Sequence, residues 1–379
     1  MRASLLSVAL SLAACGVGET SPPQVESGGD EASGTDGSSG DSSGSSSDES
    51  GSTGGSSSTG GSSSTGDSGT SDSESDGSSE ESGPVDTVQK TTLAYGDEPQ
   101  QLMDLYRPTG RSPAPLIPVV LAHGGLWQGG SKESLAGLCH DLVVDGAGTV
   151  ACASVGYHLS DELGGVCRGA GVDTYFAQAG ELQAAVLALQ GDAEALNLDA
   201  DRVYVGGHSA GGHLAQLLNL RWSAYGGSCP GPGSCPPIRG AIGFEGIYDV
   251  GNWNNYDAEV WNGAFSCATR KAFGAPPFEP PACLDAASQL PCWDMGSPVY
   301  LAAHAEELGL TPLAKVLLIQ SPDDDWVDID EVASLATALK TAAPALEVVV
   351  ATDGSCGQGG HDAVLSDPAL RNCILDFMD

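Results

Sequence analysis

Short apolar runs alternate along most of the chain with segments of helical periodicity. Apolar, β-branched runs of this length are typical of strands. They occur at Thr91–Tyr95, Leu102–Tyr106, Leu116–Ala122, Thr149–Val155, Arg202–Gly206, Gly240–Phe244, Val316–Gln320 and Leu346–Ala351. Apolar positions three and four residues apart predict helices at Ser131–Val144, Thr174–Leu189, Ala210–Ser223, Val299–Leu308, Ile329–Thr341 and Ala363–Phe377.

This order of elements predicts the fold class and the position of the site. Strands that alternate with helices indicate an α/β fold with a mostly parallel central sheet and helices on both faces. The first two strands are expected to form a hairpin, and the unbroken apolar run Val316–Ile319 suits a central strand. Sites in such sheets form beyond the carboxyl ends of the strands, so polar residues directly after strands are the functional candidates.

Residues 250–296 interrupt the alternation. They are rich in Asn, Pro and Trp and contain Cys267, Cys283 and Cys292. We interpret them as an insertion that forms a partial lid over the site and contributes to substrate specificity. The alternative is a surface loop held by disulfides.

The N-terminal quarter has a different composition. Residues 16–86 consist almost entirely of Gly, Ser, Thr, Asp and Glu, without Lys, Arg or an aromatic residue. Such a segment cannot bury enough apolar surface to fold, so residues 15–86 are predicted to be a disordered tether. The remaining residues, 87–379, are predicted to form one catalytic domain.

The first residues predict export and lipid attachment. Leu5–Ala14 is an apolar run of about ten residues, too short for a membrane-spanning helix. It ends in Leu12-Ala13-Ala14-Cys15, which resembles a bacterial lipobox, so residues 1–14 are predicted to be a lipoprotein signal peptide and Cys15 the lipidated residue. The protein is then expected in a bacterial cell envelope, anchored to the membrane by that lipid. An ordinary secretory signal with a chance cysteine is the alternative.

Charge and cysteine content agree with an exported protein. The chain has 379 residues and a formal net charge of -36, which argues against nucleic acid as a partner. Ten cysteines remain after Cys15, an even number that suggests up to five disulfides in an oxidising compartment. We expect Cys229–Cys235 and Cys356–Cys373 among them.

Gly207-His208-Ser209-Ala210-Gly211 is the strongest chemical motif. It follows a predicted strand and opens a predicted helix, the context that a G-x-S-x-G nucleophile elbow requires. The tight turn exposes the Ser209 hydroxyl, and the helix N-terminus offers the Ala210 N–H to an oxyanion. Ser209 is therefore the predicted nucleophile, and a purely structural glycine-rich turn is the alternative.

A second glycine-rich segment follows an earlier strand. His123-Gly124-Gly125-Leu126-Trp127 is similar to the HGGG-type oxyanion loop, with Leu126 in place of the third glycine. Because Leu126 replaces the third glycine, the sequence leaves open whether the Gly125 N–H or the Leu126 N–H points into the oxyanion hole. We interpret His123 as a brace for the loop. Trp127 either lines the substrate pocket or packs in the core.

The acid and the base are expected after the last two strands. Asp324 follows Val316–Gln320 and is the predicted acid. Asp323 or Asp325 would be the acid if the alignment were shifted by one residue. A calcium-binding loop is the alternative interpretation of this acidic run. His361 follows Leu346–Ala351 and is the predicted base. The chain order Ser209, Asp324, His361 is that of the Ser-Asp-His triad in this type of fold, whereas His140, His158, His208, His213 and His304 are interpreted as structural.

Together these residues resemble the esterase and lipase branch of the α/β-hydrolase superfamily, in particular feruloyl-esterase-like and kynurenine-formamidase-like carboxylesterases. The strings that carry the resemblance are Asp104-Leu105-Tyr106-Arg107-Pro108, His123–Trp127 with Gly129-Gly130-Ser131-Lys132, Val155–Leu159, Gly207–His213, Gly246-Ile247-Tyr248-Asp249 and Ser297-Pro298. Glu245 stands where the family has a small residue, and we expect it, with Trp127, at the substrate pocket.

The resemblance implies an α/β-hydrolase fold and hydrolysis through an acyl-enzyme, with no cofactor and no metal. A small ester or an acylated carbohydrate is the expected substrate. Amide hydrolysis, as by an arylformamidase or a peptidase, is the second possibility. A surface-binding lipoprotein on a catalytically dead hydrolase fold is the third, and the intact set of Ser209, Asp324 and His361 argues against it.

Overall fold

The computed structural model describes residues 87–110, 112–160, 174–226, 237–273, 292–310 and 313–379. The predicted signal peptide, the lipidation of Cys15, the tether and the Cys229–Cys235 pair lie outside these residues. Within the described part of the chain, no helix is both long and apolar enough to cross a membrane.

All eight predicted strands are present, and their bounds agree to within about two or three residues. They are β1 Val88–Ala94, β2 Leu102–Pro108, β3 Ile117–Ala122, β4 Val150–Val155, β5 Tyr204–His208, β6 Gly240–Phe244, β7 Lys315–Ile319 and β8 Val348–Ala351. They form one sheet in the order β1-β2-β4-β3-β5-β6-β7-β8. The β1–β2 hairpin and the β2–β4 pair are antiparallel, and every other pair is parallel. The predicted α/β class with a mostly parallel sheet is confirmed.

The predicted helices are also present, in part as shorter pieces. They are η1 Lys132–Leu135, α1 Ala136–Asp145, α2 Tyr175–Gly191, α3 Ala193–Leu196, α4 Ala210–Arg221, η2 Trp222–Tyr225, α5 Val250–Val260, α6 Ser266–Phe273, α7 Cys292–Met295, α8 Pro298–Ala303, α9 Ala305–Leu308, α10 Asp330–Ala342, η3 Ala363–Ser366 and α11 Pro368–Met378.

Two expectations about helices need correction. The predicted helix over residues 363–377 is divided into η3 and α11, because the Asp367 side chain caps a new helix by accepting from the Ala369 N–H and Pro368 begins its first turn. The insertion at 250–296, in which no helix was predicted, contains α5 and α6. Asp249 starts α5 by accepting from the N–H groups of Gly251 and Asn252.

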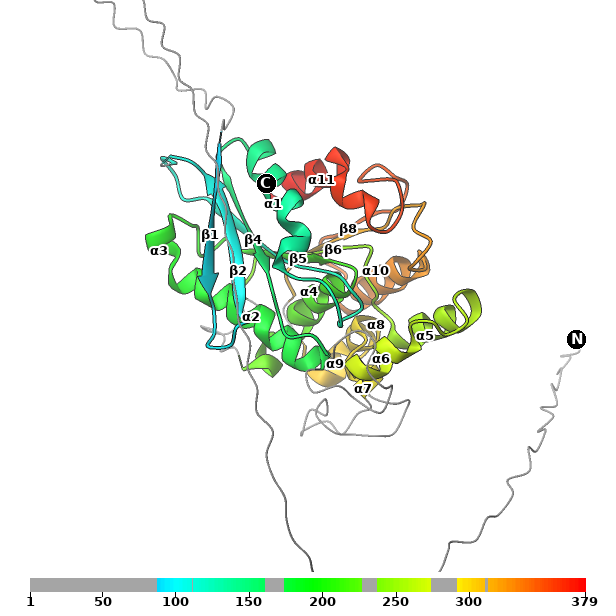
Figure 1. Ribbon diagram of the computed structural model, residues 1–379. Coiled ribbons are helices and arrows are strands. Elements are labelled where there is room, and N and C mark those ends of the chain that lie inside the picture. The colour runs from blue at the N-terminus through cyan, green and yellow to red at the C-terminus, as the bar shows by residue number, and fades with distance from the viewer. Residues whose placement is uncertain (1–86, 111, 161–173, 227–236, 274–291, 311–312) are drawn as a thin grey trace, which may run out of the picture. The chain divides into compact units, whose positions relative to one another are not determined.

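Helices cover both faces of the sheet (Figure 1). Apolar residues of α1 and α11 pack with Val119 and Leu121 of β3 in one core cluster. Apolar residues of α2, α4, α8 and α10 pack with Val120 and Ala122 of the same strand in the other. Because successive side chains of a strand point to opposite faces, neighbouring residues of β3 and of β7 belong to different clusters.

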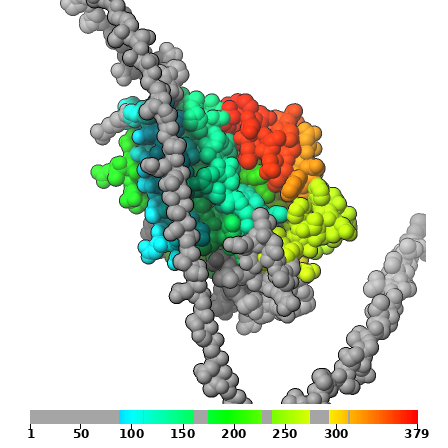
Figure 2. Space-filling view, viewed as in Figure 1, coloured from blue at the N-terminus to red at the C-terminus, as the bar shows by residue number. Residues whose placement is uncertain are grey.

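Two disulfides join elements of the layer that contains α1 and α11. Cys139 of α1 is bonded to Cys152 of β4, a pair that was not predicted. Cys356 is bonded to Cys373 of α11, as predicted, and closes the segment that contains His361. Figure 2 shows the α5–α6 part of the insertion at the molecular surface, beside the segment that leads toward the C-terminal helix.

Candidate active site

The candidate nucleophile lies in a strained turn. Ser209 follows β5 directly and precedes α4, with φ 52° and ψ −119°, a conformation that costs about 1–3 kcal/mol for a residue with a side chain. A Cβ atom on Gly207 or Gly211 would lie 2.6 Å or 2.0 Å from the Ala122 carbonyl oxygen, so both positions require glycine. The Ser209 N–H donates to the Phe244 carbonyl of β6 at 2.9 Å and holds the turn against the sheet.

Helix α4 begins at Ala210, the residue after the candidate nucleophile. The first N–H groups of a helix have no intrahelical acceptor, and the helix dipole makes this end electropositive. An oxyanion formed at Ser209 would therefore lie beside the Ala210 N–H.

The predicted oxyanion loop makes a tight turn at the mouth of the same site. The Gly125 carbonyl accepts from the Gln128 and Gly129 N–H groups at 3.0 and 2.8 Å. Gly125 has φ 116°, and a Cβ atom there would lie 2.4 Å from the Gly129 oxygen. Leu126 follows with φ 55°. Gly125 and Leu126 both line the cavity that Ser209 faces.

His123 is placed as a brace for this loop. Its ring stacks on Tyr157 with centroids 4.2 Å apart, and the Tyr157 hydroxyl donates to the His123 carbonyl at 2.7 Å. Burial lowers the pKa of His123 to about 4, so the ring is neutral near pH 7.

Trp127 packs in the core, one of the two positions expected for it, and does not line the cavity. Its side chain is fully buried, and its indole Nε1–H donates to His213 Nδ1 at 3.2 Å. An indole can only donate, so the His213 proton is on Nε2, which donates to the Gly296 carbonyl at 2.7 Å. Burial lowers the pKa of His213 to about 4, consistent with a neutral ring. Trp127 thus fastens the oxyanion loop to α4 and to the end of the insertion.

Asp324 is the acidic residue that contacts the candidate base. Its Oδ2 accepts from His361 Nδ1 at 2.9 Å, whereas Asp323 and Asp325 are exposed. Oδ2 also accepts from Gln320 Nε2 at 2.6 Å, and Oδ1 accepts from the Trp326 and Val327 N–H groups at 2.8 and 3.2 Å. Burial alone would raise the pKa of Asp324, but these hydrogen bonds, led by that from His361, outweigh it and lower the pKa to about 2. Both oxygens of the Asp324 carboxylate therefore already accept hydrogen bonds from N–H donors, an arrangement that does not resemble a calcium ligand.

His361 and Ser209 line one cavity of about 450 Å³. Because His361 Nδ1 donates to Asp324, its Nε2 is the atom free to accept a proton. Among the described residues, no hydrogen bond joins the Ser209 hydroxyl to His361. Such contacts are often long in free enzymes and tighten when substrate binds.

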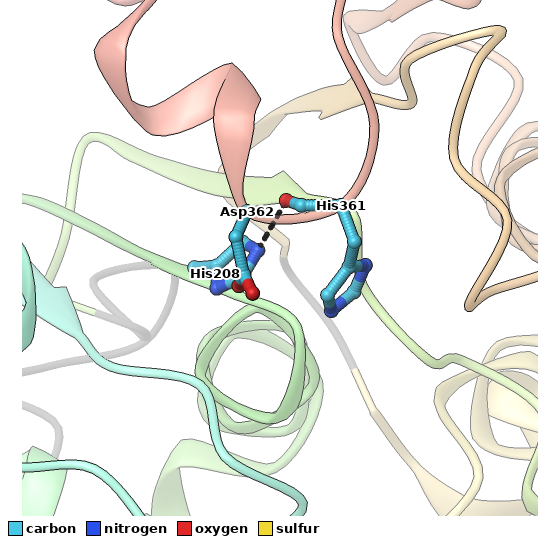
Figure 3. A group of neighbouring side chains, drawn as sticks. All are labelled: His208, His361 and Asp362. Carbon is cyan, nitrogen blue, oxygen red and sulfur yellow. Dashed lines mark hydrogen bonds between the residues drawn. The ribbon is translucent and has the colours of Figure 1, made fainter.

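His208 positions the loop of the candidate base, a role that the sequence did not indicate. Its Nε2 donates to the His361 backbone carbonyl at 2.9 Å, while the His361 ring points away from this bond (Figure 3). Burial, and then the neighbouring His361, lower the pKa of His208 to about 3, which keeps it neutral. The only available signal was its place next to Ser209, which does not reveal a contact 153 residues away.

Aromatic side chains form one wall of the cavity. Trp326 lies parallel to the His361 ring, with centroids 5.7 Å apart, and Phe265 of the insertion stacks on Trp326 at 5.3 Å. Trp253 of α5 and Ile247 complete this wall. Trp253 of the insertion therefore lines the cavity, and residues 274–291 of the predicted lid lie outside the described part.

Glu245, also expected at the pocket, does not line the cavity. It follows β6 with φ 54°, and its side chain is fully buried. Its Oε1 accepts from the Ser321 N–H at 2.7 Å, at the start of the loop that carries Asp324.

Two clusters bring three potential metal ligands within 4.8 Å of one another. They are His208, His361 and Asp362 (Figure 3), and Glu245, Asp324 and His361. In the first, His208 Nε2 already donates to a carbonyl, and in the second, His361 Nδ1 donates to Asp324. These contacts already account for one ring nitrogen of each histidine, and we assign neither cluster to a metal.

Comparison with known proteins gives a family match and an ensemble of similar folds. The BD-FAE family model matches residues 103–321, more than half of the chain. Kynurenine formamidase of Danio rerio is 33% identical over 160 residues, and that of Salmo salar is 31% identical over the same length. Each alignment covers 42% of this chain and 46% of the relative, so the chain spans about half the length of these relatives.

Solved esterase structures share the fold. Esterase B from Lactobacillus rhamnosis, with a bound inhibitor, superposes with a TM-score of 0.57 at 18% identity, covering 78% of this chain and 87% of that one. A bacterial heroin esterase gives 0.54 at 19% identity, covering 78% and 83%. A truncated carbohydrate esterase from gut microbiota gives 0.54 at 15% identity, covering 79% and 96%. At these identities the likeness shows the α/β-hydrolase fold.

Proposed function

The chain belongs to the BD-FAE family, in the esterase branch of the α/β-hydrolases, and from this premise we propose that it is an extracytoplasmic serine carboxylic-ester hydrolase. Ser209 is the nucleophile, His361 the base and Asp324 the acid that orients it. The Ala210 N–H, with that of Gly125 or Leu126, forms the oxyanion hole. The reaction passes through an acyl-enzyme.

In the first half of the reaction, the ester carbonyl carbon lies against the Ser209 hydroxyl. His361 Nε2 takes the hydroxyl proton while the oxygen attacks, and the charge on the carbonyl oxygen develops toward the N–H donors of the oxyanion hole. Asp324 stabilises the imidazolium through the Nδ1 hydrogen bond. His361 then gives its proton to the leaving alcohol, and Ser209 carries the acyl group.

In the second half, water takes the place of the alcohol. His361 Nε2 accepts a proton from this water as it attacks the acyl carbonyl. The tetrahedral intermediate uses the same N–H donors and collapses to release the carboxylic acid and the Ser209 hydroxyl. No cofactor enters either half.

One observation carries the proposal. The 2.9 Å hydrogen bond from His361 Nδ1 to the buried Asp324 makes Nε2 the ring nitrogen that can exchange a proton with Ser209, which lines the same cavity. Geometry of this kind activates a serine, and it joins three residues that are far apart in the chain.

Labelling with a fluorophosphonate and hydrolysis of p-nitrophenyl esters test it. Ser209→Ala is expected to abolish both. Asp324→Asn is expected to lower kcat about 10⁴-fold, as loss of the orienting carboxylate does in serine proteases. Asp325→Asn is the matched control, since Asp325 is exposed one residue away, and its activity should equal that of the unmodified protein. Labelling that persists in Ser209→Ala would refute the assignment.

The substrate is a small ester or an acylated carbohydrate. A cavity of about 450 Å³ is in the range of small-molecule sites, and Trp253 and Trp326 offer flat apolar surfaces beside the reacting groups. A series of p-nitrophenyl esters from acetyl to aromatic acyl groups, beside acetylated and phenolic carbohydrate esters, would rank these classes by kcat/KM.

Formamide hydrolysis is the second candidate function. The specific observation in its favour is the 33% identity to a kynurenine formamidase over 160 residues. The catalytic groups serve an amide equally well, since His361 can protonate a leaving amine. Formyl-anilides assayed beside the esters decide between the two. A higher kcat/KM for the formamide than for the esters would identify the protein as a formamidase.

For the location, we propose a lipid-anchored protein of a bacterial cell envelope. The supporting features are the lipobox-like Leu12–Cys15 segment and the two disulfides, which are typical of oxidising compartments. Incorporation of labelled palmitate should be lost in Cys15→Ser, with the protein released from the membrane fraction. Unlabelled protein with Cys15 intact would contradict the anchor.

A further inference from the structure

Two acidic side chains are buried side by side in the site, and the catalytic scheme uses only one. Carboxyl oxygens of Glu245 and Asp324 and a ring nitrogen of His361 all lie within 4.8 Å of one another. Glu245 follows β6, whereas Asp324 follows β7, the neighbouring strand. Their closeness results from the parallel sheet, which brings both loops to the same edge.

The two carboxyl groups have unequal surroundings. Asp324 accepts four hydrogen bonds from N–H donors, two on each oxygen. Glu245 accepts one, from Ser321 to Oε1, and its Oε2 has no N–H or hydroxyl partner within the described residues. A buried carboxylate is stabilised by N–H donors, so the negative charge belongs on Asp324.

Two adjacent buried carboxyl groups cannot both be ionised near neutral pH, so one keeps a proton. If Glu245 keeps the proton on Oε2, this atom becomes an O–H donor beside Asp324, and the Asp324 carboxylate is its acceptor. The other titratable groups that face Glu245 in the described structure are His361 and Tyr248, whose buried hydroxyl supplies no positive charge. Burial first, and then Asp324, raise the pKa of Glu245 to about 10.

We propose that Glu245 is a positioning residue that stays protonated and donates a hydrogen bond from its carboxyl group to Asp324. The inference rests on the proposed function, because it acts through the acid of the triad. The fifth hydrogen bond holds the Asp324 carboxylate in the one orientation that meets His361 Nδ1. The proton stays on Glu245 throughout the reaction, and Asp324 keeps a single negative charge opposite the imidazolium.

The arrangement also accounts for the backbone at this position. Glu245 has φ 54°, a conformation in which a residue with a side chain is strained, and its N–H donates to the Ile319 carbonyl at 3.0 Å. A glycine would adopt this backbone without strain. The side chain therefore compensates the strain through its two contacts with the acid loop, at Ser321 and at Asp324.

Two substitutions separate hydrogen-bond donation from a structural role. Glu245→Gln keeps the size and a donor but carries no ionisable proton, and its kcat/KM near pH 7.5 should stay within about threefold of the unmodified full-length protein. Glu245→Leu removes the donor, and kcat should fall about 10- to 100-fold with little change in KM, as loss of a hydrogen bond to a charged group implies. Glu331→Gln, at a buried carboxyl group that does not contact Asp324, is the matched control and should leave the pH profile unchanged.

The pH dependence of kcat/KM distinguishes a proton-donating role of Glu245 from a purely structural one, because a loss of packing would not change it. The unmodified protein should lose activity as the pH rises through about 10, where Glu245 ionises beside Asp324. Glu245→Gln should not show this alkaline loss, and the midpoint of its acid limb should be unchanged. At about pH 8.5, where Glu331 has ionised and Glu245 has not, the infrared difference spectrum between the unmodified protein and Glu245→Gln should show the C=O band of a protonated carboxyl group.

Three results would overturn the inference. The first is a kcat of Glu245→Gln that falls as far as that of Glu245→Leu, and the second is full activity in Glu245→Leu. The third is a midpoint of the acid limb that moves down by about one pH unit in Glu245→Gln, which would mean that Glu245 carried a charge. Ser209→Ala in the same assays keeps the two proposals apart. An active Ser209→Ala would refute the proposed function, whereas an inactive Ser209→Ala with any of the three results refutes the role of Glu245 alone.

Discussion

Backbone strain is concentrated at the catalytic loops. Seven residues other than glycine have positive φ in the described structure, and four of them are Leu126, Trp127, Ser209 and Glu245. Each lies shortly after the end of a strand that is paired in parallel, in a segment that we assign to the candidate site. Strain of this kind persists only where surrounding contacts hold it, so those contacts matter for function.

Trp127 is the clearest such contact on the oxyanion loop. Trp127→Phe removes the indole N–H and leaves His213 Nδ1 as a buried acceptor without a partner. We expect the free energy of unfolding to fall by about 1–3 kcal/mol, the cost of an unsatisfied buried group. We also expect kcat to fall about tenfold with KM little changed, because Leu126 loses its fixed position. Urea unfolding and steady-state kinetics measure the two effects.

Trp222 offers a matched control for this substitution. It is buried in the core, and its Nε1 has no hydrogen-bond partner among the described residues. Trp222→Phe removes a comparable volume without breaking a hydrogen bond, so kcat should be unchanged. An equal loss of kcat in both variants would show that general loosening, and not the Trp127–His213 bond, is responsible.

At the scale of elements, the sequence predicted the strands of the sheet but not the helices within the insertion. The strands are apolar runs on a two-sided core, so their composition alone reveals them, and the order of elements then places Ser209, Asp324 and His361 at one edge. Helices α5 and α6 were missed because their stretch is rich in Asn and Trp and lacks a clear apolar period. The break at His304 between α8 and α9 was missed because the apolar spacing continues across it.

Contacts between loops could not be predicted, because they depend on side-chain direction at the end of neighbouring strands. The sequence suggested Glu245 and Trp127 as pocket residues, since both flank recognisable motifs. The structure turns both inward, one toward Asp324 and the other toward His213. A position beside a motif indicates that a residue is near the site, but it does not decide which partner the side chain meets.

Helix α10 stabilises the loop after β6 through one buried carboxylate. Glu331 in its first turn accepts from the Tyr248 and Asp249 N–H groups, both at 2.6 Å, and from Asn252 Nδ2 at 2.9 Å. Burial raises the pKa of Glu331 to about 7 in spite of these bonds. Since the folded value is above the reference of 4.5, the folded state holds a proton that the unfolded chain has lost between these pH values. This contribution therefore makes the protein less stable as the pH rises through that range.

Glu331→Gln removes the titration and keeps an acceptor for the two N–H groups. We expect its free energy of unfolding, relative to that of the unmodified protein, to increase by about 3 kcal/mol between pH 4.5 and pH 7, because the unmodified protein loses stability there. Urea unfolding at several pH values measures the difference. Glu347→Gln, at an exposed side chain, is the matched control for the exchange itself. A constant difference for Glu331→Gln would show that its burial does not shift its titration.

At the scale of the whole molecule, the two disulfides whose cysteines both lie in the described residues belong to the layer of α1 and α11, and Cys267 of α6 is disulfide-bonded as well. Cys139–Cys152 joins α1 to β4, and neither cysteine lines the cavity. Cys356–Cys373 encloses the segment between β8 and α11, which carries His361. The layer of α2, α4, α8 and α10 instead supports Ser209 and the insertion. The proposed base and the proposed nucleophile are thus connected to helices on opposite faces of the sheet.

Removing each disulfide separates stability from activity. The closed loops have similar lengths, with sequence separations of 13 and 17, so each double Cys→Ser variant should lose about 3 kcal/mol of unfolding free energy. Only the Cys356→Ser, Cys373→Ser variant should also lose kcat at a temperature where both are folded, because its loop carries the base. The Cys139→Ser, Cys152→Ser variant is the control for lost stability. Equal kcat in the two variants would mean that the His208–His361 and Asp324–His361 hydrogen bonds hold the base without the disulfide.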